Sequence, residues 1–187
     1  MKPSHKMVLV ALLVFCPGFA RVGSGEQRVQ SIRWPDLATA GKLVSGTVIA
    51  KPEGLAEASL RVTHAEAVPA TITLVTIERP EIRMTRYAIR GRVKYDNVAP
   101  GSYLEMWNHL PEGAFFTRTL SAGGPMGRLD GSSGWRTFVL PFTNREGGAP
   151  PQKLVINIVM QGAGTVEIGP LELVQFGPGE DPLALKF

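Results

Sequence analysis

The feature that most constrains the fold is a regular alternation of side chains between Tyr87 and Tyr95. Apolar or small residues occupy the odd positions of this segment, whereas Arg90, Arg92 and Lys94 occupy even positions. Successive side chains of a β-strand point to opposite faces, so the pattern predicts a strand with one buried face and one cationic face.

A turn signal with the sequence NVAPG follows this strand at residues 97–101. It predicts a second strand at 103–107 that pairs with the first. In the second strand Leu104 and Met106 point one way, so its polar and aromatic side chains point the other way and join the cationic face. The candidate ligand-binding residues of this shared face and its margin are Trp107, Tyr103, Arg90, Arg92, Glu105 and Asn108.

Strand signals continue along the chain, separated by runs rich in glycine and proline. The predicted strands cover residues 31–34, 43–50, 58–63, 70–78, 87–95, 103–107, 115–120, 136–142, 154–160 and 165–176, the last broken at Gly169-Pro170. A short helical turn is expected at 37–40, ended by Gly41. Short strands at regular spacing without a long helix predict an all-β fold, namely an antiparallel β-sandwich of which the jelly roll is one version.

Two of the predicted strands, 136–142 and 154–160, carry apolar residues at alternate positions. We therefore expect their apolar side chains to lie in the core of the sandwich. The side chains expected to be buried are Phe138, Leu140, Ile156 and Ile158.

Both ends of the chain are expected to lie outside the sandwich. Residues 1–20 have a basic start, an apolar run too short to span a membrane and a small-x-small site, which is the layout of a secretory signal peptide. A lipid anchor at Cys16 is not expected, because the bulky residues Val14 and Phe15 precede it. A single β-sandwich domain is predicted over 26–176, followed by a flexible C-terminal tail at 177–187.

Charge and cysteine content narrow the function. Removal of residues 1–20 takes away Lys2 and Lys6 and lowers the formal net charge from +4 to +2. So weak a charge gives no support for nucleic-acid binding, which needs a clustered basic surface. The single cysteine, Cys16, lies in the same segment, so the mature domain has to be held together by its core.

No second apolar run is long enough for a membrane helix, so stable membrane insertion is not expected. Together with the signal peptide, this predicts a protein that is secreted or lies in the periplasm or cell envelope.

Three motifs occur along the chain in a set order. They are YAIRGRVK at 87–94, GWRTFVLPF at 134–142 and VEIGPLEL at 166–173. In this order they resemble jelly-roll carbohydrate-binding modules, the galactose-binding-like group attached to bacterial xylanases and glucanases. The resemblance implies a jelly-roll sandwich that binds a glycan and has no catalytic activity of its own.

The chain departs from that family at one place that concerns metal. The family's last strand usually carries an Asp pair linked to a structural calcium, but Gly169-Pro170 stands there in this chain. We therefore expect no metal. If calcium were bound after all, Asp96, Asn97 and Asp130 would be the first ligands to examine, because hard cations prefer loop oxygens.

No catalytic motif stands out. His64 and His109 are each isolated, and the sequence contains no zinc-ligand set. The nearest candidates for a glycosidase pair are Glu105, Glu112 and Asp130, and nothing in their spacing brings two of them together. We expect neither catalysis nor a cofactor.

Glu105 has a simpler interpretation. Opposite charges on adjacent strands can pair across a sheet, so Glu105 is expected to pair with Arg90 or Arg92.

Two functions remain open. An aromatic platform beside hydrogen-bonding groups suits the apolar face and hydroxyl edge of a sugar ring, so the leading hypothesis is a secreted, non-catalytic domain that binds a carbohydrate or another extracellular polymer. The alternative is a protein-interaction or envelope-assembly sandwich with no glycan ligand, acting through the same face or through the glycine-rich loop 120–135. If the face is not a ligand site, Trp107 and Tyr103 should instead pack beneath loops or a second layer.

Overall fold

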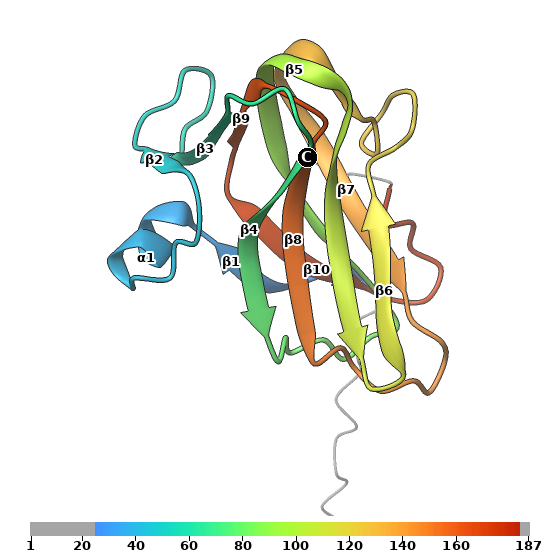
Figure 1. Cartoon of the computed structure of the whole chain (residues 1–187). Helices are drawn as coiled ribbons and strands as arrows, with labels where there is room; N and C mark the ends of the chain where they lie inside the picture. The colour runs from blue at the N-terminus through green and yellow to red at the C-terminus, as the bar shows by residue number, and fades with distance from the viewer. Residues whose placement is uncertain (1–24, 184–187) are drawn as a thin grey trace, which may run out of the picture.

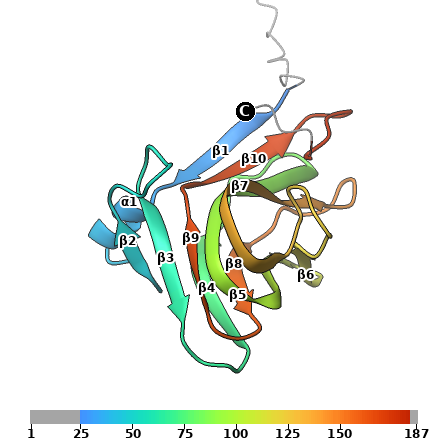
Figure 2. The same cartoon turned by 90° about the horizontal axis from the view of Figure 1, so that it is seen from above.

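The computed structural model describes residues 25–183, and in this part of the chain two antiparallel sheets pack face to face (Figures 1 and 2). The strands of the described residues are β1 (Gln27–Ile32), β2 (Thr47–Ile49), β3 (Ser59–His64), β4 (Ala70–Glu78), β5 (Arg86–Leu110), β6 (Gly113–Arg118), β7 (Leu129–Thr143), β8 (Lys153–Met160), β9 (Gly164–Ile168) and β10 (Leu171–Phe176). One short helix, α1 (Trp34–Thr39), follows β1. The predicted all-β antiparallel sandwich is confirmed.

The long strand β5 belongs to both sheets. Its first half lies in sheet A, where it pairs with β7 along one edge and with β10 and then β9 along the other. Strands β1, β3 and β2 extend sheet A beyond β10 and β9. The second half of β5 lies in sheet B, in the order β4-β8-β5-β6. In Figure 1 sheet B faces the viewer and sheet A lies behind it.

The predicted hairpin at residues 86–109 is wrong. The chain bends where the turn was expected, with positive φ at Asn97 and Gly101, but it does not reverse. Strand β7 follows β5 around the bend, since Val98 pairs with Gly131 and Ser102 with Leu129. The two halves of β5 therefore pass into different sheets and do not pair with each other.

The core lies between the sheets and confirms the predicted parity. Phe138, Leu140, Ile156 and Ile158 are fully buried. Gly91 shares their side of sheet A, and a Cβ there would come within about 3.1 Å of Phe138, Leu171 and Pro170, so glycine leaves the space that these residues fill. This packing explains the glycine in the alternating segment.

The last predicted strand, at 165–176, is interrupted where the sequence indicated. Strands β9 and β10 flank Gly169-Pro170, and both pair with β5. The buried indole of Trp34 donates from Nε1 to the carbonyls of Ile168 and Gly169, at 2.8 and 2.9 Å. The break is therefore held by hydrogen bonds from α1.

The predicted loop at 120–135 is shorter than expected, because β7 already begins at Leu129. The remaining loop lies along the free edge of β7, where the amide of Val139 donates to the carbonyl of Pro125 at 3.0 Å. The Arg136 guanidinium donates to the carbonyls of Gly127 and Arg128, at 2.7 and 3.0 Å. These bonds tie the loop to the sheet.

The ends of the chain bear on three predictions. The predicted signal peptide, residues 1–20, lies outside the described residues. The described part of the predicted tail, residues 177–183, contains no helix or strand, yet Arg86 donates to the carbonyls of Gly177 and Glu180, at 2.9 and 2.8 Å. Over residues 25–183 no helix combines the length and the apolar character that crossing a bilayer requires.

Candidate functional site

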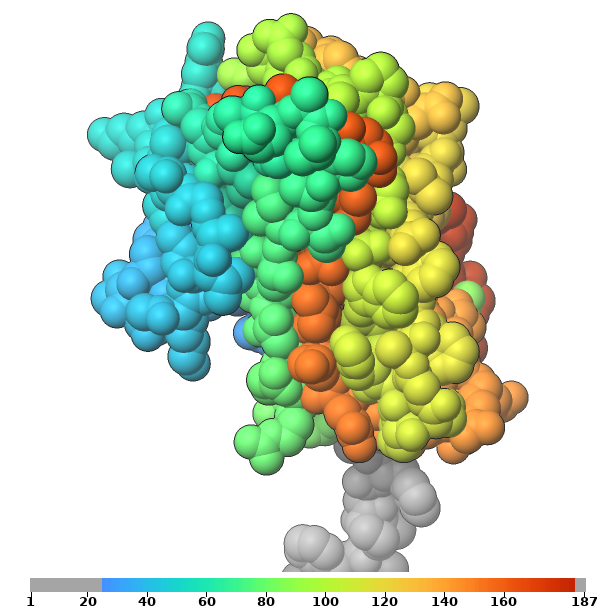
Figure 3. Space-filling model, in the orientation of Figure 1, coloured from blue at the N-terminus to red at the C-terminus, as the bar shows by residue number. Residues whose placement is uncertain are grey.

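The outer face of sheet B, which we refer to as the platform, holds both aromatic residues expected at the site, Tyr103 and Trp107. On β5 and β8 the side chains of Met106 and Ile156 enter the core, so their strand neighbours point outward. The outward residues are Thr71, Thr73, Thr76, Glu78, Lys153, Val155, Asn157, Val159, Tyr103, Glu105, Trp107, His109, Ala114, Phe116 and Arg118. Figure 3 shows this face, with β8 in orange between green β4 and the yellow residues of β5 and β6.

An aromatic pair forms the apolar part of the platform. Trp107 and Phe116 lie opposite each other on β5 and β6, with ring centroids 5.1 Å apart and planes inclined by 59°. Phe116 keeps 51% of its surface exposed, and Trp107 is half-buried. The pair therefore offers ring surface to a ligand without a covering layer among the described residues.

Glu105 organises the polar part of the platform. The residue is only 3% exposed, and both of its carboxylate oxygens accept hydrogen bonds. Oε1 accepts from the indole Nε1 of Trp107 at 2.8 Å and from Nδ2 of Asn157 at 3.0 Å. Oε2 accepts from Nε of Arg118 at 3.0 Å. Glu105 thus fixes three platform side chains, and its pairing with Arg118 corrects the predicted pair with Arg90 or Arg92.

Arg118 lies over the aromatic rings. Its Cζ is 4.0 Å from the ring centroid of Phe116 and 5.2 Å from that of Tyr103, distances typical of cation–π contacts. The ion pair with Glu105 places its charge next to a buried carboxylate. Charge, aromatic surface and hydrogen-bonding edges therefore meet at one place on the platform.

Two of the predicted site residues lie on the other side of the sandwich. Arg90 and Arg92 point outward from sheet A, because β5 crosses between the sheets after them. Arg90 pairs with Glu26 and Glu172, both at 2.8 Å, and Arg92 lies over the ring of Trp135, 5.9 Å from its centroid. The expected shared face is therefore wrong, and neither arginine can orient a ligand that stacks on Trp107.

Asn108 also lies elsewhere than expected. It is fully buried between the sheets, where its Oδ1 accepts from the hydroxyl of Tyr87 at 2.9 Å and its Nδ2 donates to the carbonyl of Phe115 at 3.3 Å. Burial raises the pKa of the Tyr87 phenol. Asn108 is thus a core residue that links the two sheets.

Three platform residues, Phe116, Arg118 and Asn157, were missed. All three fall within predicted strands, but the sequence did not show whether their side chains point into the core or outward. Phe115 and Phe116 are both apolar, so the sequence does not show which of them faces the core. Asn157 can be recognised as a platform residue only once β8 is known to pair with β5, which places it beside Glu105. A correct pairing of β8 and β6 with β5 would have found them.

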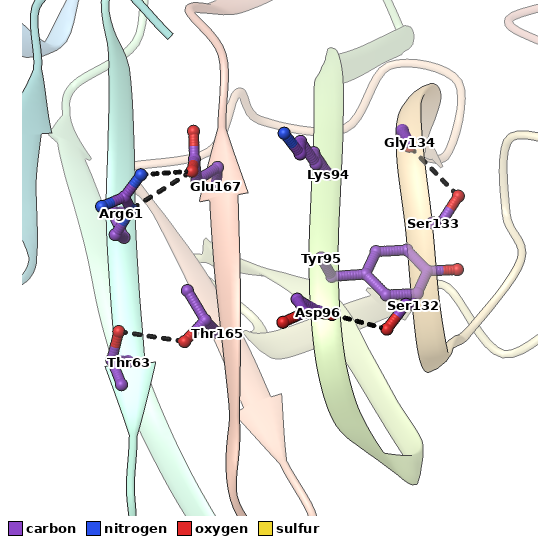
Figure 4. Close-up of a pocket in the computed structure, with 10 residues that line it drawn as sticks. All are labelled: Arg61, Thr63, Lys94, Tyr95, Asp96, Ser132, Ser133, Gly134, Thr165 and Glu167. Carbon is purple, nitrogen blue, oxygen red and sulfur yellow. Dashed lines mark hydrogen bonds and ion pairs between the residues drawn. The ribbon is translucent and has the colours of Figure 1, made fainter. Parts of the chain in front are cut away.

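The outer face of sheet A carries a broad pocket of about 710 Å³, drawn in Figure 4. Its polar side chains mostly bind one another: Arg61 pairs with Glu167 at 2.7 Å, and the Ser132 hydroxyl donates to Asp96 at 2.8 Å. The aromatic residue of its lining, Tyr95, is buried, with Arg136 over its ring. This pocket therefore offers a ligand less free aromatic surface than the platform.

The carboxylates considered for glycoside hydrolysis occupy three different places. Glu105 lies in the middle of β5, Glu112 in the turn after it and Asp130 near the start of β7. Each pairs with its own arginine: Glu105 with Arg118, Glu112 with Arg145 at 3.4 Å and Asp130 with Arg128 at 2.8 Å. In the described residues none of them forms the close acid pair that this chemistry needs.

No protein-family model matches the sequence, and no curated protein matches it in a sequence comparison. Among solved structures, the fold is similar to a family 16 carbohydrate-binding module, with 11% identity and a TM-score of 0.44 over 67% of this chain and 82% of that one. It is also similar to a family 22 xylan-binding domain from Paenibacillus barcinonensis, with 10% identity and a TM-score of 0.47 over 84% of this chain and 99% of that one. A structure of infectious bursal disease virus, Gx strain, matches with 18% identity and a TM-score of 0.42 over 68% of this chain and 32% of that one.

Carbohydrate-binding modules are thus among the folds that this chain resembles, as the strand motifs indicated. Similarity at this level concerns the fold alone. What the chain binds has to be inferred from the residues of the platform.

Proposed function

We propose that this chain is an exported, non-catalytic module whose platform binds a carbohydrate polymer. One observation carries the proposal: the exposed Trp107–Phe116 pair lies beside a fixed hydrogen-bonding group formed by Glu105, Arg118 and Asn157. A sugar ring has an apolar face and a hydroxyl edge, and these two parts of the platform match them.

The fixed geometry of the platform supports binding. Glu105 holds the Trp107 indole and the Arg118 side chain through hydrogen bonds that exist before any ligand arrives. Less side-chain freedom is then lost on binding, and this favours affinity. An open sheet face also suits a polymer, because a long chain can lie across it and extend beyond it at both ends.

The proposed place of action is outside the cytoplasm, in agreement with the predicted signal peptide. The proposed lack of catalysis agrees with the separate arginine partners of Glu105, Glu112 and Asp130. A protein-interaction role is the competing outcome of the test.

The direct test is retention of the exported chain on a panel of insoluble and soluble polysaccharides, followed by calorimetry on those that retain it. We expect micromolar to millimolar binding to at least one polymer, and an affinity that is more than about tenfold lower in Trp107→Ala. The variant must keep its melting transition, since the indole is only half-buried. Absence of binding to every plant, algal and bacterial polysaccharide tested would contradict the proposal and favour a protein partner.

A further inference from the structure

Asn157 carries an unusual group. Among residues 25–183 its Oδ1 is the buried side-chain polar atom that has no hydrogen-bond partner. The residue is 6% exposed and lies at the centre of the platform, between Thr73 on β4 and Glu105 on β5. A buried acceptor without a partner destabilises the fold, so its presence calls for an explanation such as a ligand that donates to it.

The orientation of this amide is fixed by its neighbour. Nδ2 donates to Oε1 of Glu105 at 3.0 Å, which turns Oδ1 away from the carboxylate. Exchanging the two amide atoms would place an oxygen against the carboxylate, two acceptors facing each other. Glu105 is already held by Trp107 and Arg118 as well, so the free acceptor belongs to the same network as the aromatic pair.

The charges of the platform cancel. With histidine counted as neutral, its charged residues are the acids Glu78 and Glu105 and the bases Lys153 and Arg118. Lys153 lies opposite Glu78 across β4 and β8, and Arg118 pairs with Glu105. An anionic polymer therefore meets no net positive charge here, and a ligand without charge disturbs neither pair.

We infer that the ligand of the platform is an uncharged, hydroxyl-rich glycan, one of whose hydroxyls donates to Oδ1 of Asn157. The inference rests on the proposed function and names its ligand class. Because Oδ1 is itself buried, the surrounding side chains have to move aside for the hydroxyl to reach it. Asn157 is then a specificity-determining residue, since only a donor satisfies it.

The test compares two buried asparagines. Asn144 has partners on both amide atoms, since Nδ2 donates to the Ala149 carbonyl at 2.8 Å and Oδ1 accepts from the Arg145 amide at 2.9 Å. Asn157→Ala, or Asn157→Leu to keep the volume, should weaken binding to the best neutral polymer by roughly threefold to tenfold. The melting temperature should change little, because removal of the unpaired Oδ1 offsets the loss of the Nδ2 bond to Glu105. Asn144→Ala should do the reverse, with a lower melting temperature and unchanged affinity.

The second arm of the test varies the charge of the polymer. Neutral glucan, xylan or mannan should be retained equally at low and high salt, and polygalacturonate or alginate should not be retained. If the wild type binds no glycan at all, the proposed function fails. If it binds but prefers the acidic polymers, or if both Asn157 variants bind as tightly as the wild type, the proposed function stands and this inference is wrong.

Discussion

The two outer faces of the sandwich are built on opposite principles. Sheet A presents arginines that are matched by carboxylates, as in the pairs of Arg90 with Glu172 and Arg61 with Glu167. Sheet B presents a single buried carboxylate, Glu105, beside aromatic rings that remain partly exposed. On the first face these charged groups pair with each other, whereas the second face leaves ring surface and the Asn157 Oδ1 acceptor without partners. Unmatched surface on a fixed scaffold is what a binding site requires.

The electrostatics of Glu172 and Arg90 support this contrast. Burial opposes the charge of Glu172, but hydrogen bonds from Arg90 and Arg28 outweigh it and the pKa of Glu172 is lowered. Burial likewise opposes the charge of Arg90, while hydrogen bonds to Glu26 and Glu172 leave its pKa raised. These groups stabilise each other and have little capacity left for a ligand.

The largest expected effect separates core from platform on one strand. Ile156→Ala, in the core, should lower the free energy of unfolding by about 2–5 kcal/mol, through lost burial and the cavity left behind. Val155→Ala, on the platform, should cost much less because this side chain is half-exposed. Denaturant unfolding of both variants checks this. Similar losses would mean that the parity of β8 is misassigned.

The next effect separates two neighbouring phenylalanines. Phe116→Ala should weaken binding by about 2 kcal/mol, roughly thirtyfold, because Phe116 lies on the platform. Phe115→Ala should leave affinity unchanged, since Phe115 turns the other way and contacts Phe142 with ring centroids 6.4 Å apart. Calorimetry on the two variants measures this difference. An equal loss of affinity in both would mean that the ligand does not bind on the platform.

A smaller effect concerns acid. Glu172 has a folded-state pKa below its ordinary 4.5, so its contribution to stability is present above about pH 4.5 and is lost as the pH falls through the lowered value. Melting curves from pH 7 to 3 should therefore fall less steeply for Glu172→Gln than for the wild type. Glu57→Gln is the control, because Glu57 makes a long, exposed pair with Arg33 at 3.7 Å. Identical slopes in all three proteins would speak against a structural role for the sheet A network.

The smallest expected effect is that of metal removal. Asp96 and Asp130 accept hydrogen bonds from Ser132 and from the Gly101 amide, which gives the bend of β5 its own protein partners. EDTA should leave the melting temperature unchanged. A drop of several degrees that calcium restores would show that these carboxylates hold a cation.

Much of this fold follows from period-two patterns, and the reason for the exceptions is physical. Residues 70–78 were predicted as a strand with the bounds of β4, because alternation and flanking turn residues are local signals. The path of β5 could not be predicted in this way. A hairpin and a strand that bends into a second sheet have the same alternation and the same Asn97 and Gly101 signals.

Prediction of the site residues was limited in the same way. Trp107, Tyr103 and Glu105 were predicted together because they alternate on one strand. Arg90 was wrongly joined to them because the bend was taken for a reversal. Arg118 was missed because its place beside Glu105 depends on the pairing of β6 with β5, which no local pattern contains.

The central claim is that binding occurs on sheet B and not on sheet A, and two tryptophans allow one measurement to test it. Trp107 lies on the platform, whereas Trp135 lies with Arg92 on the outer side of sheet A, where its Nε1 donates to the carbonyl of Glu53 at 2.7 Å. Affinity for the best polysaccharide should be measured by calorimetry for Trp107→Ala and Trp135→Ala. We predict a loss of more than about tenfold for Trp107→Ala and none for Trp135→Ala. Loss of binding in Trp135→Ala with full affinity in Trp107→Ala would contradict the account.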